Sequence, residues 1–306
     1  MKSPLFYAKI LLFGEYGIIN DSKALTIPFN LFKGALKKEK KFLNNSLVSN
    51  KILYKFNDYL KTQNLKLNLK KFSSDIEEGL YFDSTIPEGY GVGSSGALVA
   101  AVYERYAINK ISILENLDIK KLLKLKIIFS KMESFFHGNS SGLDPLNSYL
   151  SLPILVNSKT EIKATGIPSQ THDGNNAVFL LDSGTKSETS SLVSIFLNKL
   201  KIPAFKKMID DEFIKSSDLC IEYFLGSNNE MLFNEIKKLS SIVLEHFKPM
   251  IPSDFQKIWK DGIDNNTFYL KLCGSGGGGY ILGFTKDILK TKSILNNRKL
   301  KVVYTF

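Results

Sequence analysis

The chain has 306 residues, enough for about two domains at roughly 150 residues each. Its hydrophobic fraction of 43% and charged fraction of 23% are ordinary for a globular protein, and they argue against long disorder, collagen-like repeats and a coiled coil. No stretch approaches the roughly 18 apolar residues of a membrane helix, and 2 cysteines are too few for a disulfide framework or a Cys-rich zinc site. The low cysteine count favours a reducing, cytoplasmic setting. The N-terminal segment lacks a signal-peptide cleavage pattern, and we expect no membrane partner.

The net charge is +11, and all but Arg105 and Arg298 of the 41 basic side chains are lysine. Nucleic-acid readers rely on arginine for bidentate contacts to phosphate and guanine, so this bias favours no nucleic-acid partner. The lysine-rich runs KKEKK (37–41) and KKLLKLK (120–126) are therefore interpreted as solvated surface. A basic protein nevertheless suits an anionic ligand such as a nucleotide, which it attracts at long range.

The first half of the chain predicts a mixed set of elements. Apolar runs and alternation of β-formers predict three strands, at 7–13, 64–70 and 80–86. An Ala-rich apolar segment and a longer periodic one predict helices at 95–108 and 112–136. Residues 151–176 are weakly patterned, and we place the domain boundary there, at about 170.

The second half is richer in helical patterns. It predicts strands at 177–182, 267–273, 280–284 and 299–306, and helices at 189–200, 206–225, 229–247, 253–263 and 285–295. Strands and helices do not alternate strictly, so the α+β class is favoured over a parallel α/β sheet. The expected organisation is an N-terminal domain of residues 1–170 and a C-terminal domain of residues 171–306.

A glycine-rich loop joins a predicted strand to a predicted helix at residues 87–97, PEGYGVGSSGA. Glycine lets the backbone approach a ligand closely, and a helix N-terminus supplies free N–H groups for an anion. The two serines can cap the helix or offer a hydroxyl to a metal ion. The loop is neither a Walker A sequence nor a dinucleotide fingerprint, and a glycine-rich turn without a ligand is the alternative.

Two further segments carry residues of chemical interest. ESFFHGNSSGLD (133–144) puts a carboxylate at a helix end and another beyond a small-residue loop. Phosphoryl transfer needs one carboxylate for Mg²⁺ and another to receive the acceptor's proton, although a solvated surface is the alternative for this spacing alone. LCGSGGGGY (272–280) lies between two predicted strands, and either a ligand or a tight β-connection would explain its glycines.

Three motifs in order resemble those of the GHMP kinase superfamily: AKILLFGEYGII (8–19), PEGYGVGSSGA (87–97) and KLCGSGGGG (271–279). ESFFHGNSSGLDP (133–145) and LLDSGTKSETSSLV (180–193) look most like mevalonate kinases of the short bacterial type. The resemblance implies an ATP-dependent small-molecule kinase. It also implies an N-terminal domain like domain 2 of ribosomal protein S5, a ferredoxin-like C-terminal domain, and a site in the cleft between them.

By motif matching, the resemblance also assigns roles to residues. Ser95 and Glu133 would hold Mg²⁺. Asp144 would accept the proton of the acceptor hydroxyl, and Lys9 beside it would keep it ionised and offset charge on the transferring group. The residues implied around the ATP phosphates are Gly89, Gly91, Gly93, Ser94, Ser95 and Gly96. Those implied around the acceptor are Glu15, Tyr16, His137, Thr189, Gly276 and Gly277.

The sequence departs from the family pattern at several places. Tyr16 stands where mevalonate kinases tend to have histidine, and the usual Asn-Pro-Ser run reads Asn139-Ser140-Ser141. These differences leave the acceptor open: mevalonate is the leading candidate, and phosphomevalonate or a sugar is the alternative. A non-catalytic nucleotide-binding protein on the same fold is disfavoured because Lys9, Glu133 and Asp144 are all present. Whether the chain forms a homodimer is left open.

Overall fold

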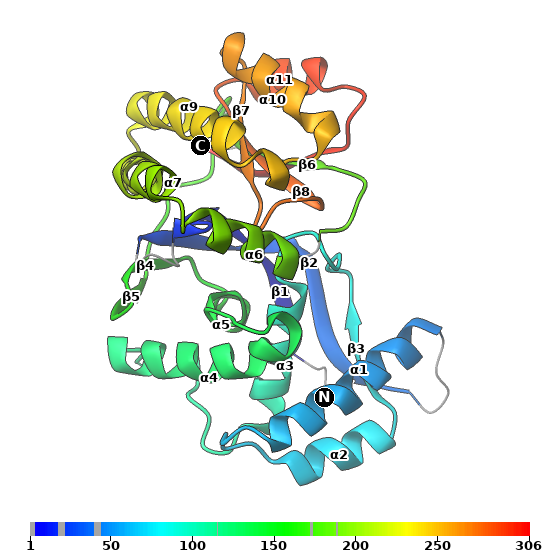
Figure 1. Ribbon diagram of the computed structural model, residues 1–306. Helices are drawn as coiled ribbons and strands as arrows, with labels where there is room; N and C mark the ends of the chain where they lie inside the picture. The colour runs from blue at the N-terminus through cyan, green and yellow to red at the C-terminus, as the bar shows by residue number, and fades with distance from the viewer. Residues whose placement is uncertain (1–3, 18–21, 40–43, 115, 172–173, 188) are drawn as a thin grey trace. The chain divides into compact units, whose positions relative to one another are not determined.

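The computed structural model describes residues 4–17, 22–39, 44–114, 116–171, 174–187 and 189–306 (Figure 1). Its secondary structure is mixed, and the α+β prediction is confirmed. The chain groups into two compact units that are interleaved in sequence. Unit 1 comprises segments 1–9, 27–88 and 93–152, and unit 2 comprises segments 10–26, 89–92 and 153–306. The assignment of domains to 1–170 and 171–306 stays a prediction.

One sheet has five strands in the part of the chain that the structure describes, in the order β1-β2-β4-β5, with β3 also paired to β2. β2 is long and contributes residues to both units: Gly34–Lys38 pairs antiparallel with β3, and Ala24–Thr26 pairs antiparallel with β4. The strands are β1 (Phe6–Phe13), β2 (Ala24–Lys38), β3 (Leu80–Ser84), β4 (Ile154–Ser158) and β5 (Glu161–Ala164).

Helices supply most of the core of unit 1. α1 packs against α2 and β3, while α3 packs against α4 and α5 (Figure 1). The ring of Tyr103 meets Phe129 and Tyr149 edge-to-face, which ties these last three helices together. The helices are α1 (Asn44–Lys61), α2 (Leu69–Glu77), α3 (Ser94–Tyr106), α4 (Ile119–His137) and α5 (Leu143–Leu150).

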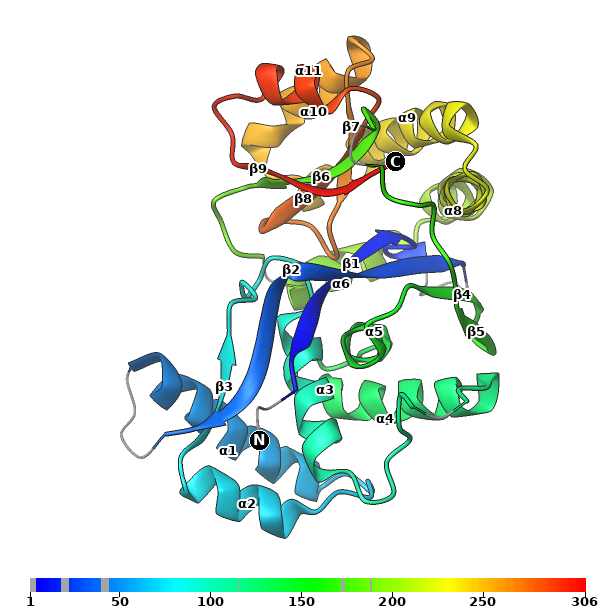
Figure 2. The same ribbon diagram turned by 180° about the vertical axis from the view of Figure 1, so that it is seen from behind.

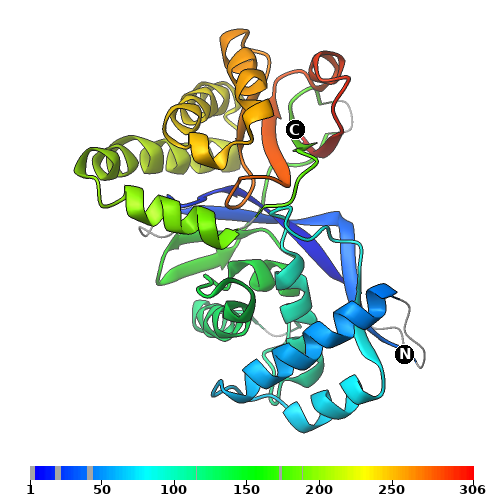
Figure 3. The ribbon, with the colours of Figure 1, turned by 45° about the vertical axis from the view of Figure 1, so that its right-hand side comes forward.

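Unit 2 is built on a four-stranded antiparallel sheet of order β7-β8-β6-β9, formed by β6 (Ala177–Asp182), β7 (Tyr269–Leu272), β8 (Tyr280–Thr285) and β9 (Leu300–Thr305). Figure 2 shows β9, in red, running along β6 at the edge of this sheet. The yellow and orange helices α9 (Asn229–His246) and α10 (Ser253–Asp264) pack on β7, as Figure 3 shows. The remaining helices are α6 (Thr189–Lys199), α7 (Pro203–Met208), α8 (Ile214–Leu225) and α11 (Ile288–Ile294), with a π-turn at Ile209–Phe213 and a 3-10 turn at Lys248–Met250.

Several sequence-based expectations about elements were wrong. Residues 64–70 form no strand: Leu67 makes one isolated bridge, and Asn68 caps α2 by accepting a hydrogen bond from the Lys71 nitrogen. The alternation in NLKLNLK therefore reflects a capped helix start rather than a pleat. The helix expected at 112–136 begins only at Ile119, because Asp118 caps it through the Lys121 nitrogen.

The structure also contains elements that the sequence did not predict. β2 contains Pro28 and Gly34, which obscure its strand pattern in the sequence, and α1 is rich in Asn and Ser. α1 is nevertheless held by three fully buried side chains on one face, Leu53, Phe56 and Leu60. Among the described residues, no helix is long and apolar enough to cross a membrane.

Candidate active site

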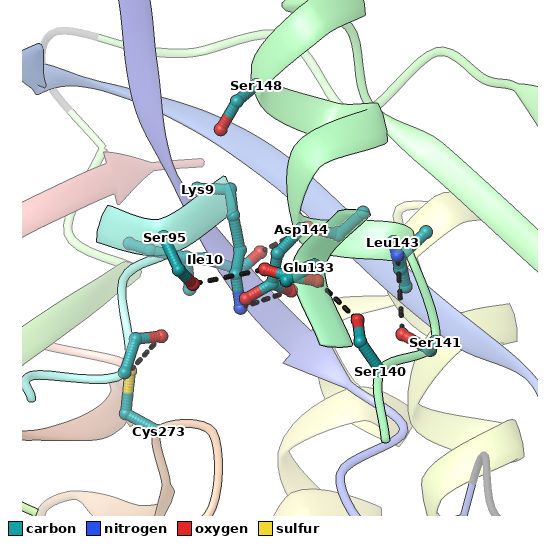
Figure 4. Close-up of polar contacts among 12 residues, drawn as sticks. Lys9, Ile10, Ser95, Glu133, Ser140, Ser141, Leu143, Asp144, Ser148 and Cys273 are labelled. Carbon is teal, nitrogen blue, oxygen red and sulfur yellow. Dashed lines mark hydrogen bonds and ion pairs between the residues drawn. The ribbon is translucent and has the colours of Figure 1, made fainter. Parts of the chain in front are cut away.

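Five polar side chains of unit 1 come together from different elements of the chain, and we call this group the carboxylate cluster. Its members are Lys9 on β1, Ser95 in the first turn of α3, Glu133 near the end of α4, Ser140 in the following loop, and Asp144 in the first turn of α5. Figure 4 shows their polar groups pointing toward one another. The cluster depends on packing, since α3 contacts both α4 and α5.

Lys9 and Asp144 form an ion pair, with 2.9 Å between Lys9 Nζ and Asp144 Oδ1. The lysine side chain is only 3% exposed, whereas the aspartate side chain is 32% exposed. A buried ammonium needs a counter-charge, so the pair holds the carboxylate in place while leaving one side of it open to solvent. The lysine stem passes over Gly93, where an added Cβ would come within 2.9 Å of Lys9 Cγ.

Glu133 is the most buried carboxylate of the cluster, at 3% exposed. The Ser95 hydroxyl donates to Glu133 Oε1 over 3.1 Å, and the Ser140 hydroxyl donates to Oε2. Burial is the main reason that the pKa of Glu133 is raised; the nearby Asp144 charge adds to the rise, and the two hydroxyls oppose it. The site therefore favours either a proton or an added cation at this carboxylate.

The cluster fits Mg²⁺ bound together with a phosphate ligand. Ser95 and Glu133 offer adjacent hard oxygen atoms, which is the donor type that Mg²⁺ prefers. The described residues contain no group of three or more His, Cys, Asp or Glu side chains that could hold a metal by themselves. Mg²⁺ commonly takes one or two protein oxygens and fills its remaining positions with phosphate and water.

The N-terminus of α3 has the features of an anion-binding site. Its N-cap is Gly93, which adopts a left-handed conformation (φ 80°) and makes no side-chain cap. The first-turn N–H groups of Ser94, Ser95 and Gly96 have no intrahelical acceptor, and they lie at the positive end of the helix dipole. At Gly96 a Cβ would lie 2.8 Å from the carbonyl carbon of Asp144, so this glycine also permits the close approach of α5.

The glycines of unit 2 bring loops together. A Cβ on Gly91 would overlap the Cys273 carbonyl oxygen, and one on Gly279 would come within 2.7 Å of the Gly89 carbonyl oxygen. Residues 89–92 of the second motif therefore pack backbone to backbone against the third motif. The third motif is held further by a hydrogen bond from the Gly277 nitrogen to the Met250 carbonyl, 2.6 Å long.

Residues 51–151 match the family model of the GHMP kinases N terminal domain. This segment, a third of the chain, corresponds to a GHMP kinase N-terminal domain. This confirms the superfamily resemblance read from the three motifs, and the segment contains Ser95, Glu133 and Asp144. No curated protein matches the sequence significantly.

Solved GHMP kinase structures resemble the whole chain. The crystal structure of L. major mevalonate kinase in complex with R-mevalonate has a TM-score of 0.68 at 14% identity and covers 100% of this chain and 96% of its own. Streptococcus pneumoniae phosphomevalonate kinase in complex with phosphomevalonate and AMPPNP has a TM-score of 0.61 at 14% identity, with 99% and 100% covered. Lactococcus lactis galactokinase complexed with galactose has a TM-score of 0.60 at 11% identity, with 98% and 92% covered. At these identities the likeness establishes the GHMP kinase fold.

The two predicted acceptor-binding residues of the first GHMP kinase motif form hydrogen bonds and ion pairs with other residues of unit 2. Glu15 is buried and paired with Lys271, whose ammonium also donates to the Leu272 carbonyl over 3.1 Å. The Tyr16 hydroxyl donates to the Ser275 carbonyl over 2.7 Å, and burial raises its pKa, with the Glu15 charge adding to the rise. Both side chains thus fasten the first motif to the third within unit 2.

The other predicted acceptor residues lie in different settings. His137 Nε2 is 2.9 Å from the Ser95 hydroxyl, beside the carboxylate cluster. Gly276 accepts a hydrogen bond from the Ser187 hydroxyl, and Gly277 packs against Leu192. Thr189 begins α6, but its side chain lies outside the described residues.

Two residues at these sites, Ser140 and Lys271, were not predicted from the sequence. Ser140 was quoted within ESFFHGNSSGLD without a role, although its position between the two acidic residues placed it near both. Lys271 opens the third motif and has apolar neighbours on both sides in YLKL. A lysine in such an alternating strand would normally face solvent, but all four residues of β7 are buried. In both cases the signal was the position in a motif rather than the residue type.

Proposed function

We propose that the protein is an ATP-dependent kinase that transfers the γ-phosphoryl group to the hydroxyl of a small molecule. The observation that carries this proposal is the Lys9–Asp144 ion pair beside the Ser95–Glu133 pair. A base, a buried cation and a hard-oxygen pair are the parts that phosphoryl transfer to an alcohol requires. A nucleotide-binding protein without catalysis would have no need for the first two.

Asp144 acts as the base in this proposal. Its partly exposed carboxylate accepts the proton of the acceptor hydroxyl as the oxygen attacks the γ-phosphorus. Lys9 holds the carboxylate in one orientation and balances negative charge that develops on the transferring group. Since the lysine is buried, its charge is weakly screened by solvent.

In this proposal the ATP phosphates bind at the N-terminus of α3, where the first-turn N–H groups follow Gly93. Ser95 and Glu133 would hold the Mg²⁺ that accompanies the nucleotide. When bound, the ion neutralises negative charge on the phosphate oxygens. The protein's own contribution is to hold its two oxygen ligands at the helix N-terminus.

Mevalonate is the acceptor that we propose, and 5-phosphomevalonate would be the product, an intermediate on the way to isoprenoid precursors. ESFFHGNSSGLDP and the segment 180–193 support this choice, as does the fold shared with a mevalonate kinase in complex with R-mevalonate. The second candidate is 5-phosphomevalonate. It is supported by the fold shared with a phosphomevalonate kinase, which covers 99% of this chain.

The test is a coupled ADP-release assay with Mg-ATP and five acceptors: mevalonate, 5-phosphomevalonate, galactose, homoserine and an N-acetylhexosamine. We expect turnover with mevalonate and background rates with the others. Turnover with another acceptor would support the kinase proposal but show that mevalonate is not the acceptor. No turnover with any of them, together with no ADP binding, would refute the kinase proposal.

A further inference from the structure

Both oxygens of the Glu133 carboxylate accept hydrogen bonds from serine hydroxyls. Ser95 donates to Oε1, and Ser140 donates to Oε2. The two hydroxyls reach the carboxylate from different elements, the first turn of α3 and the loop before α5 (Figure 4). Only Ser95 belongs to the oxygen pair proposed above as metal ligands, so the contact from Ser140 requires its own explanation.

The loop that carries Ser140 is fastened to α4. The Ser130 hydroxyl donates to the Ser140 carbonyl over 2.6 Å, and the Gly142 nitrogen donates to the Ser140 hydroxyl oxygen over 3.0 Å. Gly142 has a φ of 72°, and a Cβ there would overlap the Lys126 carbonyl oxygen and lie 2.6 Å from the Ser130 nitrogen. The Ser140 hydroxyl is therefore held in position by the backbone, and its single proton is directed to Glu133.

The side chain at position 140 also distinguishes this chain from the sequence pattern that it resembles. The resembled run has proline at this position, and proline has no hydroxyl group to donate. The hydrogen bond to Glu133 Oε2 is thus a property of this chain's own sequence. A buried carboxylate can rotate about its last bond, and a fixed donor on one oxygen removes that freedom.

We infer that Ser140 is a positioning residue that fixes the Glu133 carboxylate so that Oε1, beside Ser95, is presented to a divalent cation. This inference rests on the proposed function, because the cation is the one that accompanies the nucleotide. Hydrogen-bond partners of metal ligands orient the ligand, and their loss typically weakens metal binding or activity by about 10- to 100-fold. Ser140 acts through Glu133 and touches neither substrate.

The experiment compares Ser140→Ala with Ser140→Thr and with the matched control Ser134→Ala. Ser134 adjoins Glu133 in sequence, but its hydroxyl donates to the Ser130 carbonyl over 2.8 Å. ADP binding is measured by calorimetry in Mg²⁺ and in EDTA, and the Mg²⁺ concentration for half-maximal turnover is measured in parallel. Thermal unfolding verifies that each variant is folded.

We expect Ser140→Ala to lose about 10-fold or more of the affinity that Mg²⁺ adds to ADP binding, with unchanged affinity in EDTA. Its Mg²⁺ requirement rises by a similar factor. Ser140→Thr restores both values, and Ser134→Ala matches the wild type. A Ser140→Ala protein with the wild-type Mg²⁺ requirement, or with equal affinity losses in Mg²⁺ and EDTA, overturns the inference but leaves the kinase intact. A wild-type protein that binds no ADP and turns over none of the acceptors overturns both.

Discussion

Lys9 and Asp144 differ sharply in exposure, and this difference shapes what each can do. The lysine is enclosed by protein and cannot leave the pair without exposing an unpaired buried charge. The aspartate keeps about a third of its side chain open, so an acceptor hydroxyl can reach it. The geometry thus separates a fixed cation from an accessible base.

Replacement of Asp144 by asparagine tests the base directly. Asparagine keeps the shape of the side chain but cannot accept the proton, so we expect turnover to fall by about 10²- to 10⁴-fold. ADP affinity should change little, because the proposed phosphate contacts come from α3. Steady-state kinetics and calorimetry on the same preparation measure both quantities. Unaltered turnover would exclude Asp144 as the base.

A second residue-scale prediction concerns Gly93, whose position leaves space for the Lys9 stem. Gly93→Ala introduces a Cβ within 2.9 Å of Lys9 Cγ, at a φ of 80°. We expect the lysine to be displaced and turnover to fall by about 10-fold or more, since small misplacements at an active site can cost about 10²-fold.

The control for Gly93 is Gly184→Ala. Gly184 has a φ of 76°, but a Cβ there would meet nothing within 4 Å. Both variants carry a left-handed penalty of about 1–2 kcal/mol in the free energy of unfolding, so the comparison isolates the steric effect. Equal turnover in the two folded variants would show that the Gly93–Lys9 contact does not matter for catalysis.

At the scale of elements, one buried carboxylate joins three parts of unit 1. Asp75 on α2 accepts a hydrogen bond from the Tyr106 hydroxyl at 2.7 Å, and it pairs with Lys38 of β2 at 2.9 Å and Arg105 of α3 at 3.0 Å. Burial alone would raise its pKa, but these donors and charges outweigh it, so the pKa of Asp75 is lowered. The carboxylate therefore stabilises the fold in its ionised form.

The pH dependence of stability tests this network. Because the folded pKa lies below the unfolded value of about 3.9, the stabilisation is full above about pH 5 and is lost as the pH falls through the folded pKa. We expect Asp75→Asn to lower the free energy of unfolding by about 2 kcal/mol at neutral pH. The difference from the wild type should shrink below about pH 4 in urea unfolding experiments.

Asp58→Asn serves as the control for Asp75. Asp58 pairs with Lys61 at 2.8 Å, but both side chains are more than half exposed, and such pairs contribute about 1 kcal/mol or less. Its substitution should have little effect at any pH. A cost of Asp75→Asn that is the same at neutral and acid pH would contradict the proposed role of the ionised carboxylate.

On the scale of the whole molecule, the net charge of +11 favours the approach of a polyanion. At low ionic strength the field of the protein raises association rates, and at about 0.1 M salt it is screened beyond roughly 10 Å. We expect the association rate of a fluorescent ADP analogue to fall several-fold between low and physiological salt, with a smaller change in its dissociation rate. Stopped-flow mixing measures both rates, and an association rate that is independent of salt would refute long-range steering.

The sequence by itself determined the local chemistry of this protein. The buried strand at 177–182, the glycine loop and the start of a helix near Ser94 follow from apolar runs, positive φ and capping preferences, which act over a few residues. Local patterns gave a wrong strand prediction at 64–70, because the alternating residues there lead into the capped start of α2. They also gave no information on β2, which pairs with β3 and β4 from distant parts of the chain.

Only the tertiary structure decided which polar groups meet. Lys9, Glu133 and Asp144 come from β1, α4 and α5, and packing around α3 sets their distances. Packing likewise gave Ser140 a carboxylate partner, and it gave Glu15 and Tyr16 partners inside the protein. The physical reason is that an ion pair or a shared hydrogen bond depends on distances between elements, and no short-range pattern of residues specifies those distances.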